Sequence, residues 1–436
     1  MRIAVVGTGI AGNAAAWALS RRYPVTVYER ELRPGGHSHT VTVDYDGQRI
    51  DVDTGFIVYN ERNYPLLTSL LSHLGVATVA SCMSFAVSAN NGAFEWKGGG
   101  ENWLETAKGL FAQPSNLLSV SYLRMLRHIL RFNETSVADF ARGTLCGLSL
   151  GDYFTRRGFS RRLLRDYLAP MGAAIWSTPV QKMLDFPAEN FVAFFINHCL
   201  LQYDRPTWRT VLGGSRRYVE RIAAEFRDLR LGCAVTSIAR TAHGIVVKDS
   251  HGRSDTFDHV ILGTHTDQAL DILADASDQE RAVLGAIRYA PNTAYLHRDD
   301  RLMPKRRSAW ASWNFLRWPR QGGALNDVAV TYWMNRLQGI DDAKPLFLSL
   351  NPPFEPDPAL TFGRYIYDHP QYDAAAFRAQ QRLKDIQGQR HTWFCGAWTG
   401  YGFHEDGLRS GLAIAEALGA LAPWRATPSE LAQAAE

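Results

Sequence analysis

The pattern of apolar and polar positions changes several times along the chain. Residues 2–6 form a short apolar run, small residues follow as far as Leu19, and a second apolar run covers Val25–Tyr28. This order predicts a strand, a tight turn, a helix and a second strand within about 30 residues. From about residue 80 to 207 the pattern becomes aromatic-rich, basic and helical, without alternation of strands and helices. The first and second regions therefore belong to different domains.

The α/β pattern returns at Trp208, with a Gly213-Gly214 turn, a helix through Phe226 and a strand at Val260–Leu262. Residues 271–387 are irregular and rich in tryptophan and proline, and a strand and a last helix close the chain. We predict a Rossmann-like α/β domain and an α+β substrate or cap domain. The first comprises residues 1–80, 208–270 and 388–425, the second comprises 81–207 and 271–387, and 426–436 form a tail.

The composition excludes several classes of function. A chain of 436 residues exceeds what one core usually supports, which agrees with two domains. The net charge of +4 is too small to indicate nucleic acid, although it would not repel an anionic membrane surface. Five widely spaced cysteines predict free thiols in a reducing compartment and no metal site. We expect a cytoplasmic protein, with a peripheral place on the inner face of the cell membrane as the alternative.

The first turn carries a dinucleotide-binding pattern. Gly7-Thr8-Gly9-Ile10-Ala11-Gly12 fits G-x-G-x-x-G between a strand and a helix. The three glycines allow a tight turn, the approach of a pyrophosphate and close packing of helix on strand. Glu29 ends the second strand seventeen residues after Gly12, where a carboxylate accepts hydrogen bonds from a ribose. The alternative is a glycine-rich turn in an unrelated α/β fold.

The segment after Glu29 distinguishes FAD from NAD. Glu29-Arg30-Glu31-Leu32-Arg33-Pro34-Gly35-Gly36-His37-Ser38 resembles the second glycine signature of the flavin amine oxidase and phytoene desaturase superfamily. Blocks similar to those of this superfamily follow in the same order: Asp51–Phe56, Asn63-Tyr64-Pro65, Gly213-Gly214-Ser215, Val260–Thr264, Trp393–Gly402 and Glu405–Gly411.

The resemblance implies a glutathione-reductase-type FAD-binding domain of the amine oxidase branch. It also implies the residues that contact FAD: Gly7, Gly9, Ile10, Ala11, Gly12, Glu29, Arg30, Arg33, Gly35, Gly36, His37, Ser38, Thr54, Gly55, Phe56, Val235, Gly263, Thr264, Gly396, Trp398, Glu405, Asp406, Gly407 and Leu408. In the superfamily the helix after Glu405 points its N-terminus at the flavin, which would stabilise negative charge on the reduced ring.

Two departures from the superfamily pattern matter. No cysteine stands where it would tether the flavin, so we expect non-covalent FAD. The region Arg288–His297 contains no lysine that could match the lysine of many amine oxidases, which weakens plain amine oxidation.

The last motifs also suggest a substrate. Gly396-Ala397-Trp398-Thr399-Gly400 and His404–Gly411 resemble the bacterial FAD-binding family linked with cyclopropane or methylated fatty-acid synthesis, one branch of which acts as a desaturase in furan fatty-acid formation. This implies an oxidoreductase that dehydrogenates a lipid acyl chain, a methylated unsaturated fatty acyl group. The alternatives are an amine oxidase acting on an amine or amino acid, and a non-catalytic flavin-binding partner of other lipid-modifying enzymes.

Candidate catalytic residues follow from the expected position of the flavin. His404, Tyr401 and His37 are the candidates, because histidine titrates near neutrality and can accept a proton as hydride leaves. His404 is the foremost, since it precedes the flavin-facing helix, while Tyr401 and Trp398 fit the walls of a pocket. Each of these residues can equally be structural, since buried histidines and tyrosines commonly satisfy hydrogen bonds.

Residues 115–132 combine apolar and basic positions. The apolar ones are Leu117, Leu118, Val120, Leu123, Leu126, Ile129 and Leu130, and the basic ones are Arg124, Arg127, His128 and Arg131. Such a helix can lie in an anionic membrane surface, with arginines on phosphate groups. The alternative is a cap helix packed on its neighbours.

Overall fold

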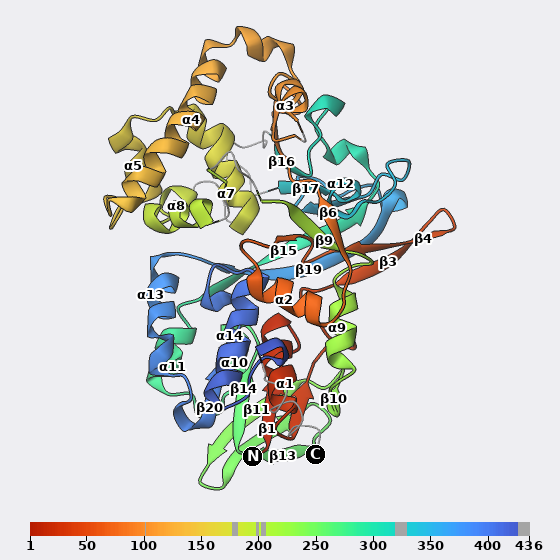
Figure 1. Ribbon diagram of the computed structural model, residues 1–436, viewed down its shortest axis with the longest axis vertical. Coiled ribbons are helices and arrows are strands. Elements are labelled where there is room, and N and C mark those ends of the chain that lie inside the picture. The colour runs from red at the N-terminus through yellow and green to blue at the C-terminus, as the bar shows by residue number, and fades with distance from the viewer. Residues whose placement is uncertain (101, 177–181, 198–199, 202–205, 319–328, 426–436) are drawn as a thin grey trace.

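The computed structural model describes residues 1–100, 102–176, 182–197, 200–201, 206–318 and 329–425. The chain forms two lobes, and the first residues of the chain lie in the same lobe as its last described residues (Figure 1). The predicted tail, 426–436, lies outside the described residues. No helix in the described ranges is both long and apolar enough to cross a membrane.

A five-stranded parallel sheet forms the centre of the lobe that holds the N-terminus. Its strands lie in the order β10 (Asp228–Arg230), β2 (Val25–Tyr28), β1 (Ile3–Val6), β14 (His259–Leu262) and β20 (Thr392–Phe394). Successive residues of β1 point to opposite faces, so Ile3 and Val5 join one apolar cluster and Ala4 and Val6 another. The continuous apolar runs predicted as strands are therefore buried on both sides.

Helices cover one face of this sheet, and a second sheet covers the other. On the first face α1 (Ile10–Ser20) packs against α14 (His404–Ala417), with α2 (Pro65–His73) and α9 (Arg216–Ala223) beside them. On the second face lies the antiparallel sheet β11 (Val235–Thr241), β12 (Gly244–Asp249) and β13 (Ser254–Phe257). Helices α10 (Thr266–Ile272), α11 (Asp278–Leu284) and α13 (Ala374–Arg382) complete this lobe, here called the parallel-sheet lobe.

A seven-stranded mixed sheet forms the core of the other lobe. Its order is β19 (Thr361–Gln371), β15 (Arg288–His297), β18 (Phe347–Leu350), β17 (Ala329–Trp333), β16 (Trp313–Arg317), β7 (Phe85–Ala89) and β8 (Phe94–Gly98). Only β16 and β7 pair in parallel among the neighbours in this sheet as described. Helix α12 (Met334–Gln338) follows β17 directly.

Helices from residues 103–197 pack beside this sheet. They are α3 (Trp103–Leu110), α4 (Val120–Ala141), α5 (Leu150–Arg157), α6 (Arg161–Leu163), α7 (Ala169–Trp176) and α8 (Ala188–Asn197). A short 3₁₀ helix, η1 (Pro114–Leu118), joins α3 to α4 at the end of the molecule farthest from the N-terminus (Figure 1). The seven-stranded sheet and α3–α8 are here called the cap lobe.

Two small sheets connect the lobes. One is the hairpin of β3 (Thr40–Tyr45) and β4 (Gln48–Asp53). The other is the three-stranded sheet of β5 (Tyr59–Asn60), β9 (Trp208–Val211) and β6 (Thr78–Ser81). The chain therefore passes between the lobes where strands pair, and the β3–β4 hairpin positions the flanking residues 37–39 and 54–56.

The predicted α/β fold with a Rossmann-like sheet is confirmed, but two local expectations are wrong. Residues 80–207 were expected to be helical, yet they begin with β7 and β8. Residues 271–387 were expected to be irregular, yet they supply five strands of the seven-stranded sheet. Pro291 in β15 and Pro370 in β19 hid part of this pattern, because a proline within a run normally argues against a strand.

Candidate functional site

The turn between β1 and α1 has the geometry that its glycines predict. Gly7 has φ +94°, and a Cβ there would stand 2.7 Å from the Gly263 carbonyl oxygen. A Cβ at Gly12 would stand 1.9 Å from the Gly7 carbonyl oxygen, so glycine is needed for α1 to pack on β1. A Cβ at Gly9 would have no neighbour within 4 Å among the described residues, because Gly9 faces a cavity. Gly9 therefore leaves space for a ligand in the cavity, while Gly7 and Gly12 pack closely against the protein backbone.

Glu29 lies directly after β2, at the edge of the same cavity. The side chain is buried, and its carboxylate accepts hydrogen bonds from the backbone N–H of Thr8 (2.9 Å) and of Glu31 (3.0 Å). These bonds fix the carboxylate beside the β1–α1 turn, where a ribose bound to that turn would lie. Arg33 also lines the cavity and donates a hydrogen bond to the Gly36 carbonyl (3.1 Å).

The cavity extends from this turn into the cap lobe and has a volume of about 1590 Å³. Drug-sized ligand pockets usually measure about 300–1,000 Å³, so this one has room for a dinucleotide and a substrate together. Gly9, Glu29, Val235 and Gly263 line one end, and Leu350 lies toward the other. The part near the turn is called the cradle end, and the part lined by residues 81–208 and 313–350 is called the cap end.

Most of the residues predicted to bind a cofactor meet in this cavity. Its lining includes Gly7, Gly9, Ile10, Ala11, Glu29, Arg30, Arg33, Gly36, His37, Thr54, Gly55, Phe56, Val235, Gly263, Thr264, Gly396, Trp398 and His404. They come from β1, β2, β11, β14 and the start of α14, which are far apart in the sequence. The set fits a flavin adenine dinucleotide: a glycine turn for the pyrophosphate, a carboxylate for the ribose, and a ring of side chains beyond it.

The other predicted residues lie outside the lining of this cavity and have structural contacts. They are Gly12, Gly35, Ser38, Tyr401, Glu405, Asp406, Gly407 and Leu408. The Glu405 carboxylate accepts hydrogen bonds from Leu66 N and Leu67 N at the start of α2, and Asp406 accepts from Tyr401 N and Phe403 N. These two carboxylates hold the N-terminus of α14 in place.

The His404 imidazole is fixed on three sides. Its Nε2 hydrogen-bonds with Ser38 Oγ and with Tyr218 Oη, both at 3.0 Å, and its ring stacks on Phe56 with centroids 3.7 Å apart. Burial lowers the pKa of His404 to about 3, so the ring is neutral near pH 7. These contacts favour a positioning role over that of a base, because Nε2 is already engaged in hydrogen bonds with two hydroxyl groups. That His404 is the base stays a prediction.

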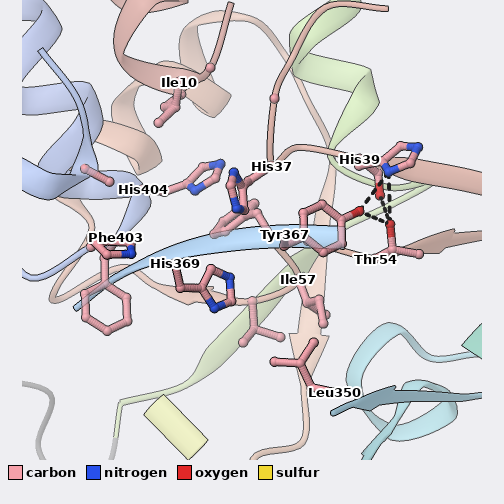
Figure 2. Close-up of a pocket in the computed structure, with 18 of the residues that line it drawn as sticks. Ile10, His37, His39, Thr54, Ile57, Leu350, Tyr367, His369, Phe403 and His404 are labelled. Atoms are coloured by element: carbon pink, nitrogen blue, oxygen red, sulfur yellow. Dashed lines mark hydrogen bonds between the residues drawn. The ribbon is translucent and has the colours of Figure 1, made fainter. Parts of the chain in front are cut away.

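The remaining polar side chains gather around β19. His37 lies 5.7 Å from His369 and 5.2 Å from Tyr367, measured between ring centroids. Tyr367 Oη hydrogen-bonds with His39 Nδ1 (2.8 Å) and Thr54 Oγ1 (2.7 Å), as Figure 2 shows. Burial lowers the pKa of His39 and of His369 to about 4 and raises that of Tyr367 to about 12. The cluster is therefore uncharged near neutral pH.

Six residues of β19 line the cavity and were not predicted from the sequence, among them the ring side chains Tyr365, Tyr367 and His369. These three alternate along the strand and so point to one face, toward His37 and His39. The alternation of Tyr365, Tyr367 and His369 with Ile366 and Asp368 was the available signal. It was obscured because the segment was expected to be irregular.

The cysteines and the other potential metal ligands that the structure describes do not form a disulfide or a metal site. The described cysteines, Cys82, Cys146, Cys233 and Cys395, are free thiols as predicted, and Cys199 lies outside the described residues. Burial raises the pKa of Cys395 to about 12, so it is a neutral core thiol. No group of three or more metal-ligating side chains occurs in the described part of the chain.

Comparison with known families now adds a decisive observation. Residues 10–300 match the profile of the flavin-containing amine oxidoreductases. The chain belongs to this family. It is therefore an FAD-dependent oxidoreductase, and the residues that line the cavity around the glycine turn fit an FAD site. A search of curated protein sequences finds no match.

Solved structures confirm the fold. A CLA-producing fatty acid isomerase from P. acnes is 15% identical with a TM-score of 0.68, over 96% of this chain and 98% of that one. Putrescine oxidase bound to putrescine is 16% identical with a TM-score of 0.67, over 96% and 99%. Cyclohexylamine oxidase from Brevibacterium oxydans IH-35A is 16% identical with a TM-score of 0.63, over 96% and 99%. At these identities the likeness concerns the fold.

Proposed function

We propose that this amine oxidoreductase dehydrogenates a lipid acyl chain, a methylated unsaturated fatty acyl group in the synthesis of furan or other modified fatty acids. The bound FAD supplies the chemistry by accepting a hydride from carbon. The protein must therefore hold an apolar chain beside the flavin, exclude water and accept one proton from the neighbouring carbon. The cavity should therefore offer apolar walls for the chain and a side chain that accepts the proton.

The observation that carries the proposal is the lining of the cap end. Among the described residues there, none carries a charged side chain. The walls are largely apolar and include Leu126, Ile129, Leu130, Met171, Leu348 and Leu350. The charged lining residues, Glu29, Arg30, Glu31, Arg33, Asp271 and Asp368, belong to the cradle end, α10 or β19. An acyl chain gains about 0.8 kcal/mol for each CH₂ buried in such walls.

The same lining argues against an amine substrate. Among its described residues the cap end offers hydroxyl groups, such as those of Ser84 and Tyr332, but no carboxylate, so an ammonium group buried there would lose hydration free energy without an ion-pair partner. The P. acnes neighbour is named as a fatty acid isomerase, which supports a chain-shaped substrate in this fold, while other neighbours are named as amine oxidases. The uncharged cap end supports the acyl chain over the amine.

We assign the proton to the His37 imidazole. His37 lines the cavity between the rings of His369 and Tyr367, and its side chain makes no hydrogen bond within the described part of the chain. Burial holds the pKa of His37 well below its usual value, so the ring is neutral and able to accept. His404, held by Ser38 and Tyr218, positions the start of α14 beside it.

Anaerobic reduction of the bound flavin tests the proposal. We expect phospholipid with methylated unsaturated acyl chains to bleach the visible flavin absorption, and putrescine to leave it unchanged. Leu126→Asp should slow the reaction with lipid, because it places a carboxylate in the cap end, while Leu126→Met should react like the wild type. Bleaching by the amine and not by lipid would establish an amine oxidase. Bleaching by dithionite and by neither substrate would favour the non-catalytic flavin-binding partner.

A further inference from the structure

The segment from α3 to the first half of α4 exposes apolar side chains to an unusual degree. The fractional exposures are 75% for Trp103, 54% for Leu117, 88% for Leu118, 71% for Val120 and 43% for Leu123. These residues lie on α3, η1 and α4, at the end of the molecule farthest from the N-terminus (Figure 1). Contiguous exposed apolar surface in a folded protein usually marks a site of interaction.

The same segment carries a net positive charge, with Glu105 in the first turn of α3 as its one acidic residue. From Thr106 to Asn133 the sequence contains Lys108, Arg124, Arg127 and Arg131 and no acidic residue. Arg124 and Arg127 are exposed on α4 and form no ion pair with the described residues. Two copies of this surface would therefore repel each other, which argues against a symmetric dimer through this face. A partner with an apolar interior and an anionic surface fits both properties.

The cavity reaches this surface at Leu130. Leu130 lines the cavity together with Leu126 and Ile129, and it is also 49% exposed. The lining of the cap end also includes Gly98, Gly99 and Gly100, which end or follow β8, and Thr106 and Leu110 of α3. Leu123 and Leu130 are seven residues, about two helical turns, apart and so share one side of α4. The exposed leucines are thus continuous with the apolar wall of the cap end.

We propose that the surface formed by α3, η1 and residues 120–131 of α4 docks on an anionic lipid bilayer. Leu117, Leu118 and Val120 enter the interface, and Arg124 and Arg127 bind phosphate groups of the headgroups. Acyl chains then pass between α3 and α4 into the cap end at Leu130. The docking follows from the surface alone, while this access route rests on the proposed function.

Cosedimentation of the FAD-loaded protein with vesicles tests the docking. Wild type should bind vesicles of equimolar phosphatidylcholine and phosphatidylglycerol, bind phosphatidylcholine alone far less, and dissociate when salt is added. Arg124→Gln with Arg127→Gln should lower the partition coefficient about 30-fold, since each basic residue near such a surface contributes about 1 kcal/mol. Leu118→Ser with Val120→Ser should lower it about tenfold or more.

Matched controls lie on the parallel-sheet lobe. Arg227→Gln with Arg378→Gln removes the same charge from exposed positions, and Leu212→Ser removes a leucine as exposed as Leu117. Both controls should bind vesicles like the wild type. Equal binding by the α4 variants and the wild type would overturn the proposal. So would self-association without lipid that the α4 variants abolish, which would identify a second copy as the partner.

Docking and chemistry can fail separately. If the protein binds mixed vesicles but their acyl chains do not reduce the flavin, the docking surface stands and the proposed function fails. If detergent-dispersed lipid reduces the flavin but vesicles are not bound, the function stands and the docking surface is refuted.

Discussion

Alanine at two glycines of the β1–α1 turn should have opposite consequences. The Cβ of Gly9→Ala would enter the cavity, with no described neighbour within 4 Å, and Gly9 has an ordinary φ of −58°. The Cβ of Gly12→Ala would stand 1.9 Å from the Gly7 carbonyl oxygen, about 1.5 Å closer than an ordinary contact. Gly9→Ala should therefore interfere with ligand binding, and Gly12→Ala should destabilise the folded protein.

The magnitudes follow from these distances. Gly9→Ala should leave the free energy of unfolding of the FAD-free protein within about 0.5 kcal/mol of the wild type. It should weaken FAD binding roughly 10- to 150-fold, because losing one hydrogen bond to a charged phosphate costs about 1.5–3 kcal/mol. Gly12→Ala should destabilise the FAD-free protein by about 3 kcal/mol, because the added Cβ would clash with the backbone carbonyl of Gly7, which cannot turn away as a flexible side chain could.

Two assays separate the effects. Urea denaturation of the FAD-free protein gives the free energy of unfolding, and titration of FAD with flavin fluorescence gives the dissociation constant. Wild-type FAD affinity in Gly9→Ala would refute the placement of the pyrophosphate at this turn. Wild-type stability in Gly12→Ala would show that α1 does not pack on β1 as closely as described.

Four other predictions address the site. Glu29→Gln should weaken FAD binding by about 1.5–3 kcal/mol in the same titration, and an unchanged affinity would remove Glu29 from the ribose role. His37→Gln should retain FAD but slow anaerobic flavin reduction about 100-fold, whereas His404→Gln should slow the same reaction less than about tenfold. If stopped-flow traces show His404→Gln to be the slower variant, His404 is the base. In the folded state the pKa values of His39, His369 and His404 are lowered to about 4, 4 and 3, so the unfolded chain binds more protons below about pH 6.5. The free energy of unfolding should therefore fall from pH 7 to pH 5, by up to about 1.4 kcal/mol per pH unit for each histidine. A urea midpoint that does not change with pH would contradict this. Acid precipitation should release all FAD into the supernatant, and flavin in the pellet would show a covalent bond.

Local chemistry explains why the cradle end could be predicted. The positions of Gly7, Gly12 and Glu29 are determined within one strand–turn–helix unit, so spacing along the sequence specifies their geometry. The same holds for β2 and β14, whose apolar runs are buried on both faces of a parallel sheet.

The cap end and the polar cluster depend on contacts between distant residues. His39 meets Tyr367 across 328 positions, and His404 meets Ser38 across 366. These pairs form only in the tertiary structure. A sequence pattern within 20 residues carries no information about them. For Glu405 and Asp406 a motif resemblance suggested cofactor contacts, which stay a prediction. Their carboxylates accept hydrogen bonds from backbone N–H groups at the start of α2 and just before α14, which the motif did not indicate.

Mass analysis of the acyl chain after one anaerobic turnover is the most direct test of acyl-chain dehydrogenation. The FAD-loaded protein is mixed with phospholipid that carries methylated unsaturated chains, and the chains are released and weighed while flavin absorption reports the electrons taken up. Dehydrogenation should give one chain lighter by two hydrogen atoms for each flavin reduced. Chains of unchanged mass, whether intact or with a displaced double bond, would contradict it.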